Sequence, residues 1–259
     1  MRLSVSKLKT FKSCRRMYEL KYQEGLYPVN TAESLETGKN YHKRLESLYN
    51  GDFDVLDDGY SKECAMAIAY HKYIYPKFKV VETEKWIEHD LGGGNKLVGQ
   101  IDAVAEDGML VEHKTYGGND SFEQYEYNLM WDEQILAYML MTGQRKMYYT
   151  VCKKPTIRQK KEETDEQFFA RMVAWYDEDT DNKIRLIMIQ RTDDDVSRFE
   201  DDLMLMVNEI LHTGYFYRNT CNCNMYGRRC EYSSICLHYD PTQTYIEFER
   251  REEHEPEEN

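Results

Sequence analysis

Residues 99–114 read GQIDAVAEDGMLVEHK, and most of what the sequence predicts follows from this stretch. Two apolar segments flank the turn-forming residues 106–108 (EDG), which is the pattern of a β-hairpin. Side chains two positions apart in a strand lie on the same face, so Glu112 and Lys114 project together. Asp102, on the neighbouring strand, can approach both of them across the hairpin.

Two carboxylates and an ammonium group on one sheet face are unfavourable when they are withdrawn from water. A divalent cation resolves this arrangement, and oxygen ligands of this kind suit Mg²⁺ or Mn²⁺, which also bind substrate phosphates. Such an ion lowers the pKa of a bound water, while Lys114 can orient that water. On this motif alone, a surface hairpin with a cross-strand Glu–Lys pair stays open as the alternative.

Outside the hairpin, apolar periodicity and capping residues predict alternating helices and strands. We expect helices over residues 5–23, 31–49, 60–75, 121–142, 164–176 and 192–212. We expect strands over residues 77–91, 95–105, 109–115, 147–154 and 183–191. This order predicts an α/β (mixed) fold in which helices flank a central mixed β-sheet.

Three further polar residues are candidates for the same site. Gln134 and Tyr138 lie four positions apart on a predicted helix and therefore share a face, where they can hold the lysine or the DNA backbone. The alternative is a core tyrosine with a glutamine above it. His42 lies on a helix face between Gly38 and Leu45, and it is either a core histidine or the single imidazole ligand of a carboxylate-bound metal.

Charge is unevenly distributed along the chain. The 259 residues carry a formal net charge of −13, which is unusual for a nucleic-acid-binding protein. Residues 1–23 nevertheless hold seven Lys/Arg against one acid, and Arg15 and Arg16 are the candidates for a DNA path. A solvated helix face is the alternative. Residues 246–259 are predicted to form an acidic, disordered tail.

The composition is that of a soluble globular protein, with 41% hydrophobic and 31% charged residues. No apolar run approaches the roughly 20 residues that cross a bilayer, and no signal-peptide core opens the sequence. We therefore expect a cytoplasmic protein without a membrane partner.

The distribution of the seven cysteines indicates metal ligation. Four of them lie within sixteen residues near the carboxyl end: Cys221, Cys223, Cys230 and Cys236. Disulfides are unlikely without a secretion signal, and thiolates select iron–sulfur clusters or zinc. Reduced, purely structural thiols remain the alternative. Cys64 and Cys152, in a predicted helix and strand, are expected in the core.

Taken in order, the motifs resemble a known family. They are His42, GQID with Asp102, EHK with Glu112 and Lys114, and Q-x-x-x-Y with Gln134 and Tyr138. The opening adds S-x-x-x-T-F-x-x-C at residues 6–14, followed by Arg15, Arg16 and Tyr18. Together they resemble the RecB-type branch of the PD-(D/E)XK nucleases, and in particular its iron–sulfur members. Those members include CRISPR-associated exonucleases, AddB-type recombination nucleases and many phage-encoded nucleases.

The resemblance implies roles for the hairpin residues. The metal, Mg²⁺ or Mn²⁺, would be held by His42, Asp102, Glu112 and the main-chain carbonyl of His113. Lys114 would be the catalytic lysine. Glu82 or Glu84, on the strand before Asp102, would be a further acid.

The resemblance also implies roles for the surrounding residues. Gln134 and Tyr138 would support catalysis, and Tyr138, Arg15 and Arg16 would contact DNA. A [4Fe–4S] cluster, with Zn²⁺ as the alternative, would be held by Cys14, Cys223, Cys230 and Cys236. The family often shows C-x2-C-x5-C, whereas six residues separate Cys223 from Cys230 here, and Cys221 competes for the place of Cys223.

The resemblance finally implies an architecture and an activity. Residues 1–245 would be a single nuclease domain with a restriction-endonuclease-like core at about 78–190. Residues 1–75 and 191–240 would supply the helical part that the cysteine cluster joins. The implied function is a DNA exonuclease acting on single-stranded or end-bearing DNA in recombination, repair or phage DNA processing, with recombination or CRISPR-adaptation proteins as partners. An endonuclease, a partner-dependent nuclease and a non-catalytic DNA-binding scaffold are the alternatives.

Overall fold

The computed structural model describes residues 1–29, 33–117, 121–225, 228–237 and 246–251. The chain divides into two compact units. Unit 1 comprises Met1–Ala32, Asp90–Val98 and Glu200–Asn259, and unit 2 comprises Glu33–His89 and Gly99–Phe199. The helices Glu33–Tyr49 and Lys62–Tyr73 belong to unit 2, together with the sheet. In the described ranges, no helix is long and apolar enough to span a membrane.

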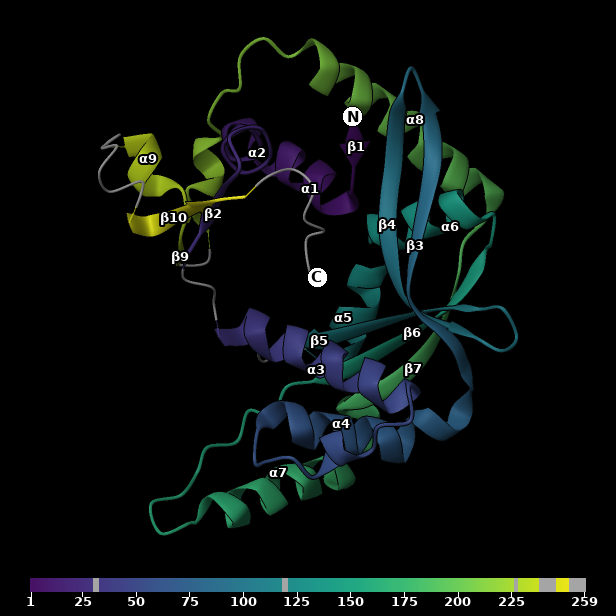
Figure 1. Cartoon of the computed structure of the whole chain (residues 1–259), viewed down its shortest axis with the longest axis vertical. Helices are drawn as coiled ribbons and strands as arrows, with labels where there is room; N and C mark the ends of the chain where they lie inside the picture. Colours follow the sequence, from purple (N-terminus) through teal and green to yellow (C-terminus); the bar gives the residue numbers. More distant parts are fainter. Residues whose placement is uncertain (30–32, 118–120, 226–227, 238–245, 252–259) are drawn as a thin grey trace. The chain divides into compact units, whose positions relative to one another are not determined.

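A mixed β-sheet lies at the centre of unit 2 (Figure 1). Its strands are the carboxyl part of β4 (Asn95–Ala105), β5 (Leu110–Tyr116), β6 (Lys146–Lys153) and β7 (Ile184–Gln190), in that order. The pair β4–β5 is antiparallel, β5–β6 is parallel and β6–β7 is antiparallel. The long strand β3 (Val80–Gly92) pairs with β4. The predicted central mixed sheet is confirmed.

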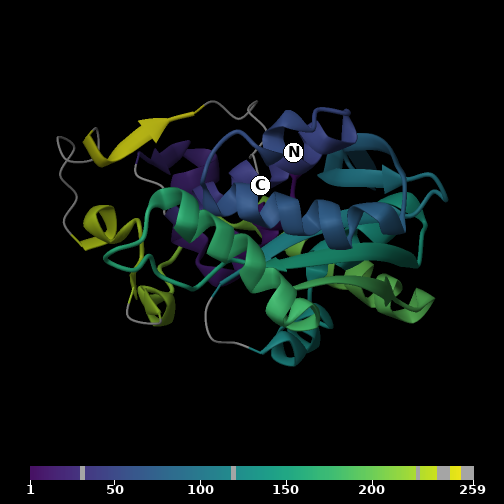
Figure 2. The same ribbon diagram turned by 90° about the horizontal axis from the view of Figure 1, so that it is seen from below.

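One face of this sheet is covered by α3 (Glu33–Tyr49), α4 (Lys62–Tyr73) and α7 (Asp165–Glu178) (Figures 1 and 2). On α3, the buried residues Tyr41, Leu45 and Leu48 recur at helical spacing and form its apolar stripe. They pack with Tyr70 of α4 and Tyr176 of α7. Short 3₁₀ helices connect these elements at Asp54–Leu56, Tyr75–Lys77 and Thr180–Asn182.

The other face is covered by α5 (Phe122–Leu129) and α6 (Glu133–Thr142). The sequence predicted one helix over residues 121–142, and this prediction was wrong. Asp132 has an extended backbone, and its carboxylate accepts a hydrogen bond from the Gln134 N–H at 3.0 Å, so it caps a new helix. Gly143 ends α6 in the left-handed conformation, at φ 74°.

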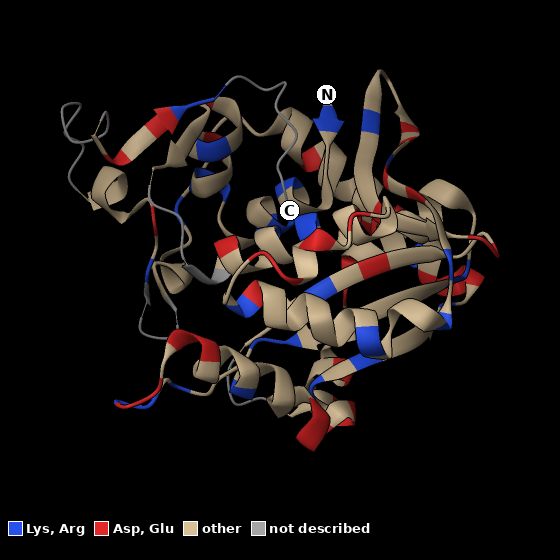
Figure 3. Cartoon of the chain, turned by 60° about the horizontal axis from the view of Figure 1, so that its bottom comes forward, with Lys and Arg blue, Asp and Glu red and all other residues tan. Residues whose placement is uncertain are grey.

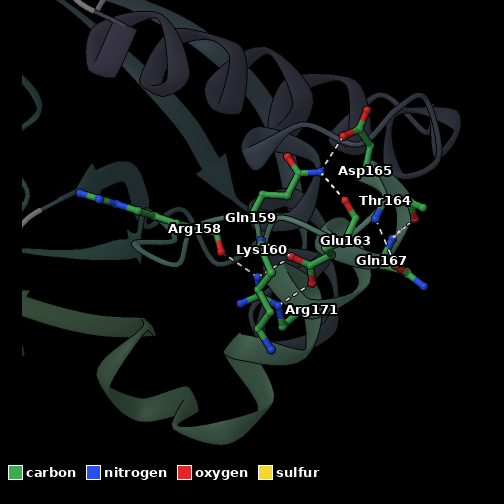
Figure 4. A network of polar contacts seen from close by, with 8 residues as sticks. All are labelled: Arg158, Gln159, Lys160, Glu163, Thr164, Asp165, Gln167 and Arg171. Carbon is green, nitrogen blue, oxygen red and sulfur yellow. Dashed lines mark hydrogen bonds and ion pairs between the residues drawn. The ribbon is translucent and has the colours of Figure 1, made fainter.

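A polar network organises the loop between β6 and α7 (Figure 4). The Arg171 guanidinium donates to both carboxylate oxygens of Glu163 at 2.8 and 2.7 Å, and to the Arg158 carbonyl at 2.8 Å. Thr164 and Gln167 form a reciprocal capping box at the start of α7. The loop therefore has a fixed base, although it lies at the surface.

Unit 1 contains both described chain ends. Its elements are β1 (Arg2–Leu3), α1 (Val5–Ser13), α2 (Arg15–Tyr18), a π-helix (Glu19–Gln23), β2 (Leu26–Pro28), a 3₁₀ helix (Thr220–Asn222), β8 (Asn224–Met225), β9 (Arg228–Arg229), α9 (Ser233–Leu237) and β10 (Phe248–Arg250). Helix α8 (Asp193–His212) belongs to this unit from Glu200 onward. β1 runs parallel to the amino part of β4, and β10 runs antiparallel to β2.

The predicted helix over residues 5–23 is interrupted at Cys14, whose backbone is extended. Tertiary hydrogen bonds explain the interruption. The Ser13 carbonyl accepts from the side-chain amides of Asn219 at 2.8 Å and Asn222 at 2.6 Å, and these partners lie over two hundred residues away. Local helix propensity does not contain this information.

The start of the expected tail also differs from the prediction. Residues 248–250 form strand β10 against β2, and the Phe248 ring stacks on Tyr232 with centroids 5.3 Å apart. Burial of this aromatic side chain offsets the entropy of ordering the segment. Residues 252–259 of the predicted tail lie outside the described residues.

Candidate active site

Asp102 lies where β4 and β5 part. The two strands are in register at Ala103↔Val111 and Val104↔Leu110. At the next position, one carboxylate oxygen of Asp102 accepts a hydrogen bond from the His113 N–H at 2.6 Å. Asp102 is 8% exposed and Glu112 is 1% exposed. The hairpin therefore brings the two carboxylates together in the interior of unit 2.

His42 reaches the same carboxylate from α3. Its Nδ1 lies 3.4 Å from the second Asp102 oxygen. Gly38, one turn earlier on α3, faces the Thr115 hydroxyl of β5, and a Cβ there would make an ordinary van der Waals contact with it at 3.4 Å. Burial opposes the charged form of both partners, yet Asp102 raises the pKa of His42, and His42 lowers that of Asp102.

Glu112 and Lys114 project from β5 together and form an ion pair, as the two-residue spacing predicts. Apart from this contact with Lys114, neither Glu112 carboxylate oxygen has a hydrogen-bond partner within the described residues. Burial, and then the charge of Asp102, raises the pKa of Glu112 to about 7. Burial opposes the charge of Lys114, but Glu112 and Asp102 raise its pKa. The two buried carboxylates thus share the Lys114 ammonium group. This sharing stabilises the charged form of Lys114, but one positive charge does not balance two buried carboxylates.

These donors have the chemistry of a divalent-cation site. No group of three or more His, Cys, Asp and Glu side chains in the described part of the chain is gathered closely enough to hold a metal ion as it stands. Yet the buried oxygens of Glu112, whose one partner in the described residues is Lys114, lie beside a second carboxylate, and oxygen donors of this kind fit Mg²⁺ or Mn²⁺. The residues of this hairpin therefore fit the metal that the sequence suggested.

Gln134 and Tyr138 form the predicted pair on one face of α6. The Gln134 amide donates to the Tyr138 hydroxyl at 2.8 Å, and this hydroxyl donates to the Gln100 carbonyl at 2.6 Å. Gly99 allows the close contact, because a Cβ there would lie 3.0 Å from the Tyr138 ring. These hydrogen bonds thus lead to the main chain of β4, and the pair holds the strand that carries Asp102.

Of the two acids on β3, Glu84 lies near the site. The charges of Asp102, Glu46 and His42 act on it, and burial raises its pKa to about 7. Its φ of 50° is unusual for a non-glycine residue, and the Gln100 amide donates to its carbonyl at 3.3 Å. Glu82 instead pairs with Lys85 at the surface.

The sequence reading missed the partners of His113. This side chain is 2% exposed and lies on the opposite face of β5 from Glu112. Its ring nitrogens lie 2.6 Å from the Thr150 hydroxyl and 3.2 Å from the Tyr49 hydroxyl. Burial lowers the pKa of His113 to about 3. The neutral ring of His113 therefore anchors the peptide whose N–H binds Asp102. From the sequence, the alternation of side chains in E-H-K indicated only which face of β5 the His113 ring is on.

The four predicted cluster ligands are among the described residues and all belong to unit 1, although no three of them are close enough to hold a metal ion as they stand. Cys14 and Cys223 both lie within electrostatic range of Cys236, and Cys223 and Cys236 lie within range of Cys230. Burial raises the pKa of Cys230 and of Cys236. Cys221 is exposed and is absent from these neighbours. Cys64 and Cys152 are buried in unit 2, which confirms their prediction as core residues.

The two arginines predicted to contact DNA both have acidic partners. The Arg15 guanidinium donates to Glu209 from Nε at 2.9 Å and stacks near the Tyr217 ring. Arg16 pairs with Glu19 and with Glu24. Both side chains are thus engaged within unit 1.

Comparison with known proteins identifies the superfamily. A family model described as the PD-(D/E)XK nuclease superfamily matches residues 2–69 and 60–237. The chain belongs to this superfamily. No curated protein matches the chain.

Two solved structures are similar to the chain. One is from Eubacterium rectale and is named as a proposed exonuclease; its TM-score is 0.56 at 14% identity, over 92% of this chain and 88% of that one. The other is an alkaline exonuclease from Laribacter hongkongensis, with a TM-score of 0.44 at 13% identity, over 81% and 88% of the two chains. At 14% identity, the similarity to the Eubacterium rectale structure shows a shared fold alone, over 92% of this chain.

Proposed function

We propose that the chain is a metal-dependent deoxyribonuclease that hydrolyses phosphodiester bonds at the site of His42, Asp102, Glu112 and Lys114. The observation that carries this proposal is the state of Glu112. Its carboxylate is 1% exposed, has the Lys114 ammonium as its partner and lies beside the second buried carboxylate of Asp102. One ammonium group does not balance two buried carboxylates, so the arrangement is unfavourable for folding unless a further cation binds there, and a functional reason for it is expected.

The proposed metal donors are the carboxylates of Asp102 and Glu112, the His42 ring and the main-chain carbonyl of His113. Mg²⁺ and Mn²⁺ prefer this oxygen-rich set, and superfamily membership supports the choice. When bound, such an ion supplies Lewis-acid stabilisation of phosphate charge and lowers the pKa of water.

The side chains around the metal donors have distinct proposed roles. Lys114, which is 25% exposed, orients the attacking water and offsets charge that develops on the phosphate. Tyr138 and Gln134 hold the Gln100 carbonyl and thereby fix the strand that carries Asp102. Glu84 is the further acid on this side of the site.

We also propose that Cys14, Cys223, Cys230 and Cys236 hold a [4Fe–4S] cluster, with Zn²⁺ as the alternative. The mutual proximity of these thiols supports the proposal, and so does their chemistry, since thiolates select these two cofactors. The exposed Cys221 supports the assignment of Cys223 rather than its neighbour. The proposed role of the cluster is structural.

A basic loop offers a path for DNA on a chain that is acidic overall. Lys and Arg are interspersed with Asp and Glu along most elements (Figure 3). Residues 153–161, KKPTIRQKK, are different, because they hold five Lys/Arg and no acid. The network around Arg171 fixes the base of the loop, and the Arg158 side chain extends away from it (Figure 4). We propose that this loop of unit 2 binds DNA phosphates, and, as a separate contact on unit 1, that Arg15 and Arg16 do so.

The proposed substrate is single-stranded or end-bearing DNA, cut as an exonuclease. The test is degradation of end-labelled single- and double-stranded DNA with Mg²⁺ or Mn²⁺ by the wild-type protein and by folded Lys114→Ala and Glu112→Ala variants. We expect metal-dependent loss of DNA that disappears in both variants. The order in which labelled products appear separates exonuclease from endonuclease. Cleavage that survives both substitutions would falsify the proposed site.

A further inference from the structure

A buried imidazole lies directly behind the candidate active site. His113 is on β5 between Glu112 and Lys114, and its ring is on the opposite face of the strand from their side chains. Both ring nitrogens have partners: Nδ1 lies 2.6 Å from the Thr150 hydroxyl of β6, and Nε2 lies 3.2 Å from the Tyr49 hydroxyl of α3. Three elements of unit 2 thus meet at one side chain.

The partners of His113 suit a neutral ring. A neutral imidazole donates from one nitrogen and accepts at the other, and a hydroxyl can do either, so Thr150 and Tyr49 satisfy both tautomers. Thr150 is the neighbour of His113 in the parallel β5–β6 register, and Tyr49 also stacks on the ring with centroids 5.8 Å apart. The Tyr49 hydroxyl is in turn hydrogen-bonded to that of Tyr70 on α4. His113, Thr150 and Tyr70 are buried, so these hydrogen bonds are shielded from water and strengthened.

The main chain of His113 belongs to the proposed metal site. Its N–H donates to one carboxylate oxygen of Asp102 at 2.6 Å, and its carbonyl is one of the metal donors proposed above. Ring and peptide are parts of one residue, so hydrogen bonds that fix the ring also limit rotation of the peptide. The position of two metal donors therefore depends on a side chain that faces away from them.

Helix α3 is held to the hairpin at two points. His42 lies with its Nδ1 3.4 Å from the other carboxylate oxygen of Asp102. Tyr49 follows seven residues later, so it shares a face of the helix with His42, and it meets the ring of His113. The rings of His42 and His113 also lie edge to face, with centroids 6.2 Å apart. The contacts of His113 thus help to set the separation between the imidazole donor on α3 and the carboxylate donors on the sheet.

We propose that Thr150 and Tyr49 are positioning residues of the metal site and that they act through His113. By fixing its ring, they fix the peptide that binds Asp102 and the helix that carries His42. This inference rests on the proposed metal-dependent nuclease function and deepens it, because it identifies what arranges the donors before a metal binds. Mg²⁺ requires near-ideal octahedral geometry, so small displacements of the donors weaken its binding.

The test removes one hydrogen bond at a time in the full-length protein. Thr150→Val keeps the shape of the side chain and removes its hydroxyl, Thr150→Ser retains the hydroxyl, and Tyr49→Phe retains the stacked ring. Thr180→Val and Tyr148→Phe are the matched controls, because each removes a hydrogen-bonded hydroxyl elsewhere in unit 2.

Metal binding and catalysis are measured separately. Isothermal titration calorimetry with Mn²⁺ in the absence of DNA gives the affinity of the site, which is defined as the binding that Glu112→Ala abolishes. Cleavage at saturating metal gives kcat and KM for DNA. Thermal unfolding without added metal shows how far each substitution affects stability alone.

We expect Thr150→Val to weaken Mn²⁺ binding by roughly 10- to 100-fold and to lower kcat, while KM for DNA stays near the wild-type value. Thr150→Ser retains most of the affinity, and Tyr49→Phe loses less than Thr150→Val because its ring still stacks. The two controls bind Mn²⁺ like the wild type. A purely structural role would lower the unfolding temperature and leave the Mn²⁺ affinity of the folded protein unchanged, which would overturn the proposal.

Three further outcomes decide the proposal. Equal losses of Mn²⁺ affinity in Thr150→Val and in the controls would overturn it. If Thr150→Val does not fold, Tyr49→Phe provides the test, and unchanged Mn²⁺ affinity in that variant would overturn it. A wild-type protein without Glu112-dependent Mn²⁺ binding would overturn both this inference and the proposed metal site. If the wild type binds Mn²⁺ there but cleaves no DNA, the nuclease function fails, and the Mn²⁺ affinities of the variants still support or overturn the positioning role.

Discussion

The carboxylate site of unit 2 and the thiol cluster of unit 1 are both assembled from distant parts of the sequence, but they are held in different ways. Asp102 is fixed by the His113 N–H on one side and by His42 on the other. Cys230 and Cys236 are only half-buried. Each lies within electrostatic range of the other and of Cys223. The first site is preorganised by protein hydrogen bonds, whereas the second has a weaker framework of its own.

This difference indicates where a metal contributes to folding and where it contributes to chemistry. A site that is already held by hydrogen bonds gains little order from its metal, and its stability is limited by the charges it buries. The proposed cluster would join residue 14 to residues beyond 220 and would depend on its metal, because the free energy of metal binding there would contribute directly to folding. The following predictions test this contrast in order of decreasing effect.

The largest effect is expected for Cys14→Ser and Cys236→Ser. Loss of a thiolate ligand removes the proposed cluster, and the free energy of unfolding of unit 1 falls by about 5 kcal/mol because the closure of a very long loop is lost. Iron and sulfide content, visible absorbance and the midpoint of thermal unfolding measure this. Cys221→Ser is the matched control, since this thiol is exposed. A Cys14→Ser protein with an intact cluster would remove Cys14 from the ligand set.

Asp102→Asn is expected to lower kcat/KM of metal-dependent cleavage about a thousandfold without unfolding the protein. The amide oxygen can still accept the His113 N–H, so the strands stay in place, but the charge that attracts the metal is gone. Glu82→Gln, at the surface of β3, is the control. Titration of activity with Mg²⁺ and thermal unfolding separate the two effects. Near-normal cleavage would show that Asp102 is structural.

Glu112→Gln is expected to stabilise the metal-free protein at pH 8. The folded pKa of Glu112 is about 7, above the ordinary value of 4.5, so its contribution favours folding at low pH and is lost as pH rises through 7. At pH 8 the buried anion therefore costs up to about 3 kcal/mol. The variant escapes this cost, and the difference should vanish near pH 4.

Thermal unfolding at several pH values, with and without Mg²⁺, measures the effect of Glu112→Gln. Added Mg²⁺ should stabilise the wild-type protein and not the variant, because the ion needs the carboxylate. A variant that is less stable than the wild type at pH 8 without metal would mean that the Lys114 pair outweighs the burial of Glu112.

How far the sequence predicted each region follows from the range of the interactions involved. The hairpin, the shared face of Glu112 and Lys114 and the Gln134–Tyr138 pair were predictable, since each depends on spacing within one or two elements. The helix break at Cys14 was not, because the Ser13 carbonyl is taken by side chains from another segment. Local patterns contain no record of such partners.

The same reasoning applies to the site itself. The contact of His113 with Thr150 and Tyr49 joins three elements, and no motif marks it. Glu84 has a left-handed φ within strand β3. The surrounding structure imposes this conformation, so the local sequence does not predict it. Glu46 was within reach of the sequence, because it lies four positions after His42 on α3 and therefore shares its face.

The smallest effects are expected at the surface, where DNA phosphates are proposed to bind. Replacing Arg158, Lys160 and Lys161 with Ala should weaken DNA binding about tenfold at low salt and reduce the salt slope by about one for each lost phosphate contact. Lys79→Ala, which removes a lysine paired with Glu106, is the control.

The double substitution of Arg15 and Arg16 by Ala should have a smaller effect than the loop variant. These guanidiniums already pair with Glu209, Glu19 and Glu24. Binding DNA would exchange a carboxylate partner for a phosphate, so the net gain in binding free energy is small. Binding measured across a range of salt concentrations compares the two variants directly. A larger loss in the arginine variant would place the DNA path on unit 1, and the thiol cluster would then support substrate binding as well as the fold.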